Sequence, residues 1–141
     1  MPRWRPQFQV ADIAQQVVGG FLLAGPFVVT EEVWTLATEM GWLHGLATAA
    51  LVFAIGYGAL YGADADRDPE RERDVVGIPV RFVSLMGVAF GSVTILALVF
   101  GAPATFLADL PAMERFGVTI RAITVGAIFS VVGAATADSV Y

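Results

Sequence analysis

The chain has 141 residues, of which 57% are hydrophobic and only 15% are charged, and its formal net charge is −5. A water-soluble domain of this size needs a polar surface that is large relative to its volume, so this composition argues against one. All eight basic residues are Arg in an acidic, lysine-free chain, which argues against a nucleic-acid-binding protein. The composition instead predicts an all-α, polytopic integral membrane protein.

Four apolar segments are long enough to cross a membrane, because a helix needs about 20 residues to span a hydrocarbon layer of roughly 30 Å. They cover approximately residues 13–36, 42–62, 80–101 and 116–137. The short link "TEMG" makes the first two an antiparallel hairpin, and the last two form a second hairpin. We therefore expect a single four-helix transmembrane domain over residues 1–141.

The first segment contains Pro26 directly after Gly25, followed by Glu31 and Glu32 near its end. Proline removes a backbone hydrogen bond, so a kink is predicted at Pro26. Ionisable side chains inside a span are rare and usually face protein or water. On an unbroken helix, Glu32 shares an apolar face with Gly25, which would let another helix come close. Glu31 lies instead near the polar line of Asp12, Gln16 and Thr30. We therefore expect Glu32 to be the more buried of the two.

The links predict the orientation of the chain. The link over residues 63–79 is polar, and the link "APATFLADLPAMERF" is expected to form a short helix along the membrane interface. Arginine accumulates in cytoplasmic links, and six Arg residues fall on the side shared by the N-terminus and the first of these links: Arg3, Arg5, Arg67, Arg71, Arg73 and Arg81. Both termini of a plasma-membrane protein are therefore predicted to be cytoplasmic. Trp4 on this side, and Trp34 and Trp42 on the other, are expected to be interfacial anchors.

Matching depths predict two charge pairs. The fourth segment places Arg121 at a depth comparable with that of Glu31 and Glu32, and Asp12 and Arg81 are matched at the other end. A pair would reduce the cost of burying both charges. Such pairs can be interpreted in two ways. They are either structural contacts that fix the helix register, or parts of a path for ions or protons. A surplus of acids at the outer side would concentrate cations if it were repeated around an oligomer.

Small residues recur four positions apart in three segments, which places each set along one helix face. The sets are Ala50, Ala54, Gly58 and Gly62; Gly87 and Gly91; and Ala122, Gly126, Ser130 and Ala134. Such spacing is typical of helix packing in membranes. Because the sets outnumber what one bundle needs, we expect a homo-oligomer.

The stretch "GPFVVTEEVW" resembles the first-span signature of a family of uncharacterised archaeal and bacterial predicted integral membrane proteins. In that signature a Pro and a few apolar residues precede Thr-x-Glu-x-Trp. The match places on the signature Pro26, Thr30, Glu32 and Trp34. Glu31 takes a position that is usually apolar in the family. The resemblance implies a polytopic membrane protein and singles out Glu32, but it brings no known activity.

Other site chemistry finds little support. The chain has no Cys, which excludes disulfides and thiolate zinc sites. The link "DADRDPERERD" lacks the Gly and Glu that a calcium loop requires, and the metal is left unassigned. His44 is the single histidine and is interpreted as an interfacial residue or, alternatively, a pH sensor. With no nucleophile motif or phosphate-binding loop, neither an enzyme nor a cofactor is predicted.

The leading functional hypothesis is passage of cations or protons across the lipid bilayer through a homo-oligomer. Glu32 would be the intramembrane carboxylate and Arg121 its counter-charge, with Thr30 and Gly25 shaping its surroundings. The alternative is a non-transporting scaffold or accessory subunit whose ion pairs are structural. The acidic, lysine-free composition is also typical of a halophile.

Overall fold

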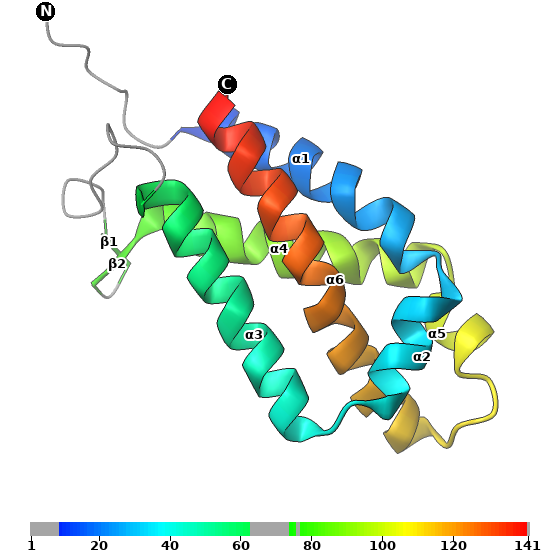
Figure 1. Cartoon of the computed structure of the whole chain (residues 1–141). Helices are drawn as coiled ribbons and strands as arrows, with labels where there is room; N and C mark the ends of the chain where they lie inside the picture. Colours follow the sequence, from blue (N-terminus) through cyan, green and yellow to red (C-terminus); the bar gives the residue numbers. More distant parts are fainter. Residues whose placement is uncertain (1–8, 63–73, 76, 141) are drawn as a thin grey trace, which may run out of the picture.

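The computed structural model describes residues 9–62, 74–75 and 77–140 and confirms an all-α architecture (Figure 1). Within these residues, four helices are long and apolar enough to cross a membrane. They are α1 (Val10–Val28), α3 (Trp42–Tyr57) with its π-helical continuation η1 (Gly58–Gly62), α4 (Val80–Val99) and α6 (Ala112–Val140). Two short helices, α2 (Glu31–Glu39) and α5 (Ala102–Phe106), lie in the links, and two short antiparallel strands, β1 (Asp74–Val75) and β2 (Ile78–Pro79), precede α4.

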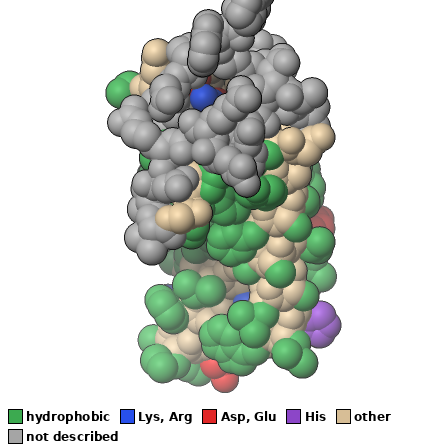
Figure 2. Space-filling view, turned by 90° about the vertical axis from the view of Figure 1, so that its left-hand side faces the viewer, with side chains coloured by type: hydrophobic (Ala, Val, Ile, Leu, Met, Phe, Trp, Pro, Cys, Tyr) green, Lys and Arg blue, Asp and Glu red, His purple; other side chains and the backbone are tan. Residues whose placement is uncertain are grey.

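Helix α6 is the core of the bundle and contacts α1, α2, α3 and α4. Of its most apolar window, 61% is buried, against 22% to 33% for the other three spans. The outer helices therefore present most of their surface to lipid. Figure 2 shows hydrophobic side chains over the middle and lower parts of one face of the bundle.

Helices α1 and α6 are in close contact at Gly19 and Gly133. A Cβ atom added to either glycine would overlap the backbone carbonyl oxygen of the other. Only glycine permits this approach, which brings the two backbones into contact and provides packing attraction where burial from lipid gives little.

The three sets of small residues have different surroundings. In α6, packing is confirmed, because its four members are buried: Ala122, Gly126, Ser130 and Ala134. In α3 and η1, the set does not pack against the other described helices, because all four members are exposed: Ala50, Ala54, Gly58 and Gly62. Packing of this set between copies stays a prediction. The face of α3 that turns inward carries Gly45, Val52 and Gly56 instead. Gly87 and Gly91 on α4 likewise have no atom near an added Cβ among the described residues.

The prediction of one continuous helix through residue 36 is wrong. Helix α1 ends at Val28, and α2 begins at Glu31. Pro26 lies in the last turn of α1, where it withholds one backbone hydrogen bond. The sequence predicts a kink at Pro26 within a continuing helix. In the structure, the helix ends two residues after Pro26.

Thr30 and Trp34 stabilise this helix break. The Thr30 hydroxyl and N–H both donate to the Phe27 carbonyl oxygen, at 2.8 and 3.1 Å. The Trp34 Nε1–H donates to the Val28 carbonyl oxygen at 3.0 Å. Side-chain donors thereby satisfy carbonyls that the end of α1 would leave unpaired. The three residues Pro26, Thr30 and Trp34 of the resemblance motif therefore form a local helix-break device.

The bundle has two ends that differ in content. We call the end at which α1 begins and α6 ends the terminal end, and the end that carries α2 and α5 the α2 end (Figure 1). The short helix predicted in the third link is present as α5. Its Phe106 ring stacks on Trp34 with centroids 6.1 Å apart, which ties α5 to α2.

Candidate functional site

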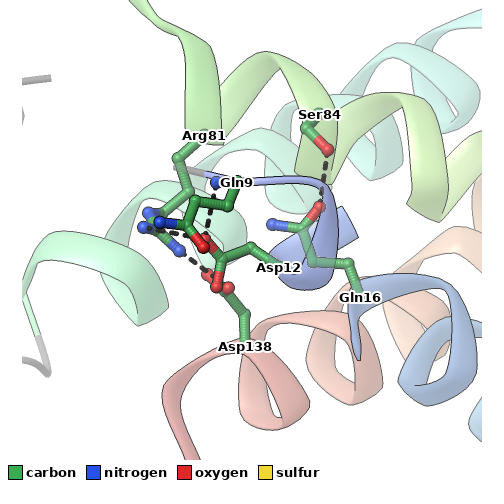
Figure 3. A network of polar contacts seen from close by, with 6 residues as sticks. All are labelled: Gln9, Asp12, Gln16, Arg81, Ser84 and Asp138. Atoms are coloured by element: carbon green, nitrogen blue, oxygen red, sulfur yellow. Dashed lines mark hydrogen bonds and ion pairs between the residues drawn. The ribbon is translucent and has the colours of Figure 1, made fainter. Parts of the chain in front are cut away.

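A buried ion-pair network links three helices at the terminal end. The Arg81 guanidinium on α4 donates to Asp138 of α6 at 2.8 Å and lies 3.5 Å from the Asp12 carboxylate of α1 (Figure 3). The exposed fractions of the side chains are 6% for Arg81, 0% for Asp138 and 22% for Asp12. The predicted pairing of Asp12 with Arg81 is therefore present, and Asp138 joins it as a partner that the sequence analysis missed.

Local structure positions Asp12 for this network. Asp12 lies in the first turn of α1, and its carboxylate accepts the Gln9 backbone N–H at 2.8 Å. A negative charge there also complements the partial positive charge of the helix N-terminus. The carboxylate is thus fixed on the bundle side of α1, where Arg81 reaches it.

One turn further into the bundle, Gln16 continues the network. Its side chain is fully buried, and its Oε1 accepts the Ser84 hydroxyl at 2.7 Å (Figure 3). Its Nε2 is buried and has no hydrogen-bond partner among the described residues. We use the name polar cluster for the five side chains Asp12, Gln16, Arg81, Ser84 and Asp138.

Two more hydroxyls converge deeper in the bundle, around Gly20. A Cβ atom added to Gly20 would lie 2.9 Å from Ser130 Oγ and 3.1 Å from Ser92 Oγ. Both serines are buried, and Ser130 Oγ has no hydrogen-bond partner within the described part of the chain. A buried polar group without a partner costs about 1–3 kcal/mol, so the positions of Ser130 Oγ and Gln16 Nε2 favour a small hydrogen-bonding species.

The core becomes apolar toward the α2 end. Its buried members there include Ala24, Val28, Val93, Ala97 and Ala122, each no more than 1% exposed. Nine positions of α6 separate Ser130 from Arg121, which is about 13 Å along the helix axis. In this stretch of α6 Thr124 is also buried, but its hydroxyl donates to the Arg121 carbonyl oxygen of its own helix at 2.7 Å. The polar groups that connect different helices therefore lie in the terminal half, and tightly packed Ala and Val side chains separate them from the α2 end.

The comparison with protein families places the chain among membrane proteins. A family described as "Putative integral membrane protein (DUF2391)" matches residues 4–138. The chain belongs to this family. With four helices of spanning length, this member is a multi-pass integral membrane protein. The match confirms the resemblance at the level of the family, whereas the signature itself stays a prediction. None of the curated proteins or solved structures compared with the chain matches it.

In this membrane protein, the expected burial of Glu32 is wrong. Glu31 and Glu32 are both exposed and occupy the first turn of α2. The break at Thr30 starts a new helix, so Glu32 no longer continues the face of α1. Carboxylates in a first turn are stabilised by the helix dipole, so the start of α2 explains the presence of both glutamates without a role in transport. Gly25 also fails to bring a second helix close, since an added Cβ would meet its nearest neighbour, Leu96 Cδ1, at 4.0 Å.

The expected pairing of Arg121 with Glu31 or Glu32 is also wrong. The Arg121 Nε–H donates instead to the Ala37 carbonyl oxygen at 3.2 Å, near the C-terminal end of α2. Among the described residues, Arg121 forms no ion pair. The reason is the direction of α2, which turns its C-terminal carbonyls rather than its N-terminal carboxylates toward α6.

The aromatic and histidine predictions have mixed outcomes. Trp34 is 1% exposed and packs in the core, so its assignment as an interfacial anchor is wrong. Trp42 is 66% exposed, as an anchor requires, and Trp4 lies outside the described residues. His44 accepts the Gly41 N–H through Nδ1 at 3.1 Å and so caps the start of α3.

Sequence reasoning did not single out Asp138, Ser84 or Ser92, and it considered Ser130 only as a small residue for helix packing. A signal for Asp138 was available in "ATADS". This acid ends the fourth segment at the depth of Asp12 and Arg81, so the depth argument that paired those two residues also applies to it.

Proposed function

We propose that this membrane protein passes protons or small cations across the bilayer, and that Asp138 with Asp12 provides the intramembrane carboxylates. The observation that carries the proposal is the fully buried Asp138 carboxylate on a membrane-spanning helix, paired with Arg81. Ionisable groups inside a span are costly and typically mark ion pathways or proton relays. The proposal moves the role first assigned to Glu32 to the opposite end of the bundle.

The polar groups beyond Asp138 extend this site into the bundle. Ser130 lies eight positions before Asp138 on α6, about 12 Å along the axis. Between them lie the Gln16–Ser84 hydrogen bond and, near Ser130, the Ser92 hydroxyl. Hydroxyl and amide groups both donate and accept hydrogen bonds, which is what a relay of protons or a partly hydrated cation requires.

The α2 end would supply the second access point. Glu31, Glu32 and Glu39 border a groove of about 400 Å³ on α2, and their charges would raise the local cation concentration. The apolar layer of the core lies between this groove and Ser130. Passage therefore needs either a rearrangement at the helix break that includes Thr30, or a route between copies in a homo-oligomer.

A non-transporting scaffold is the second candidate, and a specific observation favours it. The Arg81 side chain connects α1, α4 and α6, so its charges would fix helix register even without any transport. In that case the apolar layer is a permanent seal rather than a gate.

Proton flux into liposomes that contain a pH-sensitive dye tests the proposal. We expect Asp138→Asn to reduce the flux at least about tenfold, because an amide cannot take up and release a proton as a carboxyl group does. Asp109→Asn, the matched control, removes an exposed carboxylate outside the groove on α2 and should change the flux less than about twofold. Absence of flux from the parent protein, in both proton and cation assays, would favour the scaffold.

A second variant protects the test against misfolding of Asp138→Asn. Ser130→Ala removes a hydroxyl that has no partner among the described residues, so the fold should tolerate it. Reduced flux in a stable Ser130→Ala protein supports the relay. Full flux in both Ser130→Ala and Asp138→Asn would contradict it.

A further inference from the structure

A hollow at the α2 end, on the far side of the bundle from the polar cluster, has the features of an anion site. It has a volume of about 410 Å³ and lies between the end of α2, the start of α3 and the first turns of α6. Its lining includes Thr38, Trp42, Glu114, Gly117 and Arg121. The cationic member, Arg121, is the residue whose predicted acidic partners lie elsewhere.

The Arg121 side chain is held by contacts with three residues, two of which involve its guanidinium. Its Nε–H donates to the Ala37 carbonyl oxygen at 3.2 Å. Its Cζ lies 5.9 Å from the centroid of the Trp42 ring, within the range of a cation–π contact. A Cβ added to Gly45 would lie 3.4 Å from Arg121 Cγ, so the aliphatic part of the side chain crosses α3 at a glycine.

The rest of the guanidinium is available to a ligand. An arginine side chain has five N–H donors, and the Ala37 carbonyl takes one of them. Within the described ranges, no carboxylate pairs with Arg121, and no other acceptor bonds its terminal nitrogens. A half-buried cation in an apolar setting gains from an anion, and the planar fork of Arg fits two oxygens of a phosphate at once.

The depth of Arg121 points to lipid as the source of that phosphate. Arg121 and Asp138 are 17 positions apart on α6, which is about 25 Å along the axis. The hydrocarbon layer is roughly 30 Å thick. With the polar cluster near one boundary of this layer, Arg121 lies just inside the other, from where a long side chain reaches the headgroups.

Apolar and acidic neighbours complete the match to a phospholipid. Trp42 is 66% exposed and Met113 is 84% exposed, so both offer surface to acyl chains beside the hollow. Glu114 places a carboxylate in the lining of the same hollow, where it can meet the ammonium group of a zwitterionic headgroup. The same carboxylate would disfavour a small free anion at this position.

We propose that this hollow binds one phospholipid, with Arg121 on the phosphate, Trp42 beside the guanidinium and Glu114 toward a headgroup ammonium. The site is separate from the polar cluster, so the proposal does not depend on transport.

Native mass spectrometry of the detergent-solubilised full chain, titrated with phosphatidylethanolamine, tests this site. We expect Arg121→Gln to weaken binding of the first lipid at least about tenfold, because it removes the charge-assisted bonds. Arg115→Gln is the matched control, since it removes the same charge from the same helix but its guanidinium already bonds the Ala108 and Leu110 carbonyls. Equal lipid binding by the parent protein and the Arg121→Gln variant would overturn the proposal.

A second variant and a competing anion make the test decisive. Gly117→Leu fills the hollow without removing the charge, since an added Cβ would already lie 3.5 Å from Arg121 Nη1, and it should also weaken lipid binding. If Arg121→Gln does not fold, Gly117→Leu carries the test, and unchanged binding there contradicts the proposal. Inorganic phosphate at millimolar concentration should not displace the lipid. Full displacement would assign the site to free phosphate and overturn the lipid assignment.

Discussion

In the terminal half of the bundle, Arg81 joins Asp12 and Asp138, and Gln16 bonds Ser84. In the α2 half, by contrast, Trp34 and Phe106 stack over a core of Ala and Val side chains. Helices α1, α4 and α6 contribute to both halves, whereas α2 and α5 belong to the α2 half alone. On α6, the inward positions change from Asp138 and Ser130 to Gly126 and Ala122 within a few turns.

The difference shows how a small membrane protein separates specificity from closure. Polar contacts are directional, so the terminal half fixes which helices meet and in which register. Apolar packing of small residues excludes water, so the α2 half seals the bundle. Four variants, taken from the largest expected effect to the smallest, test this division.

Gly133→Leu should be the most damaging change. The new side chain would collide with the Gly19 backbone on α1, which cannot move aside without separating α1 from α6. We expect a loss of about 3 kcal/mol or more, measured as the free energy of unfolding in mixed micelles. Gly87→Leu is the control, since no atom lies within 4 Å of its added Cβ. Equal stability of the two variants would show that the contact at Gly133 does not hold the bundle together.

Arg81→Met should destabilise the terminal half by about 3 kcal/mol, because it removes the guanidinium that donates to the buried Asp138 carboxylate at 2.8 Å. The double variant Arg81→Met/Asp138→Asn should recover part of this loss, since it also removes the buried negative charge. The same unfolding measurement, run as a double-mutant cycle, gives the coupling. Additive effects of the two substitutions would mean that Arg81 and Asp138 have no coupling energy, and that their pair does not fix the contact between α4 and α6.

Trp34→Phe tests the α2 half. Phe keeps an aromatic ring against Phe106 but cannot donate to the Val28 carbonyl oxygen, so a loss of about 1 kcal/mol is expected. Hydrogen exchange should also speed up for amides around Val29 and Thr30, while those near Gln16 stay protected. Trp42→Phe, at an exposed position, serves as the control. Unchanged exchange at the break would show that the indole does not stabilise it.

Ser130→Ala should be the least damaging change. Its hydroxyl has no partner among the described residues, so removing it should not lower the free energy of unfolding and should raise it by up to about 1 kcal/mol. Ser84→Ala breaks the bond to Gln16 and should cost about 1 kcal/mol. A larger loss for Ser130→Ala than for Ser84→Ala would reveal a hydrogen bond at Ser130 that stabilises the fold.

Hydropathy was sufficient to predict most of the fold. The second, third and fourth spans agree closely with the helices Trp42–Gly62, Val80–Val99 and Ala112–Asp138, because a long apolar run in lipid must satisfy its own backbone as a helix. The first span failed at its end, because hydropathy does not register the hydrogen bonds that Thr30 and Trp34 donate across the break.

The site was harder to predict for the same reason. Extending one helical face past Thr30 carried Glu32 into the interior, although the break places it in the first turn of a new helix. Depth matching succeeded for Asp12 with Arg81, where both helices are regular. It could not place Ser92 and Ser130 together, because their convergence depends on the close approach of α1 at Gly20.

The uneven core also shapes how a transmembrane voltage would act on the protein. Charged and hydrogen-bonding side chains are far more polarisable than Ala and Val, so the electric field would concentrate in the apolar layer between Ser130 and Arg121. That layer is about 13 Å thick, less than half of the roughly 30 Å hydrocarbon core. A potential of 100 mV, worth about 2.3 kcal/mol per elementary charge, would therefore fall across less than half the usual distance, next to the helix break between α1 and α2.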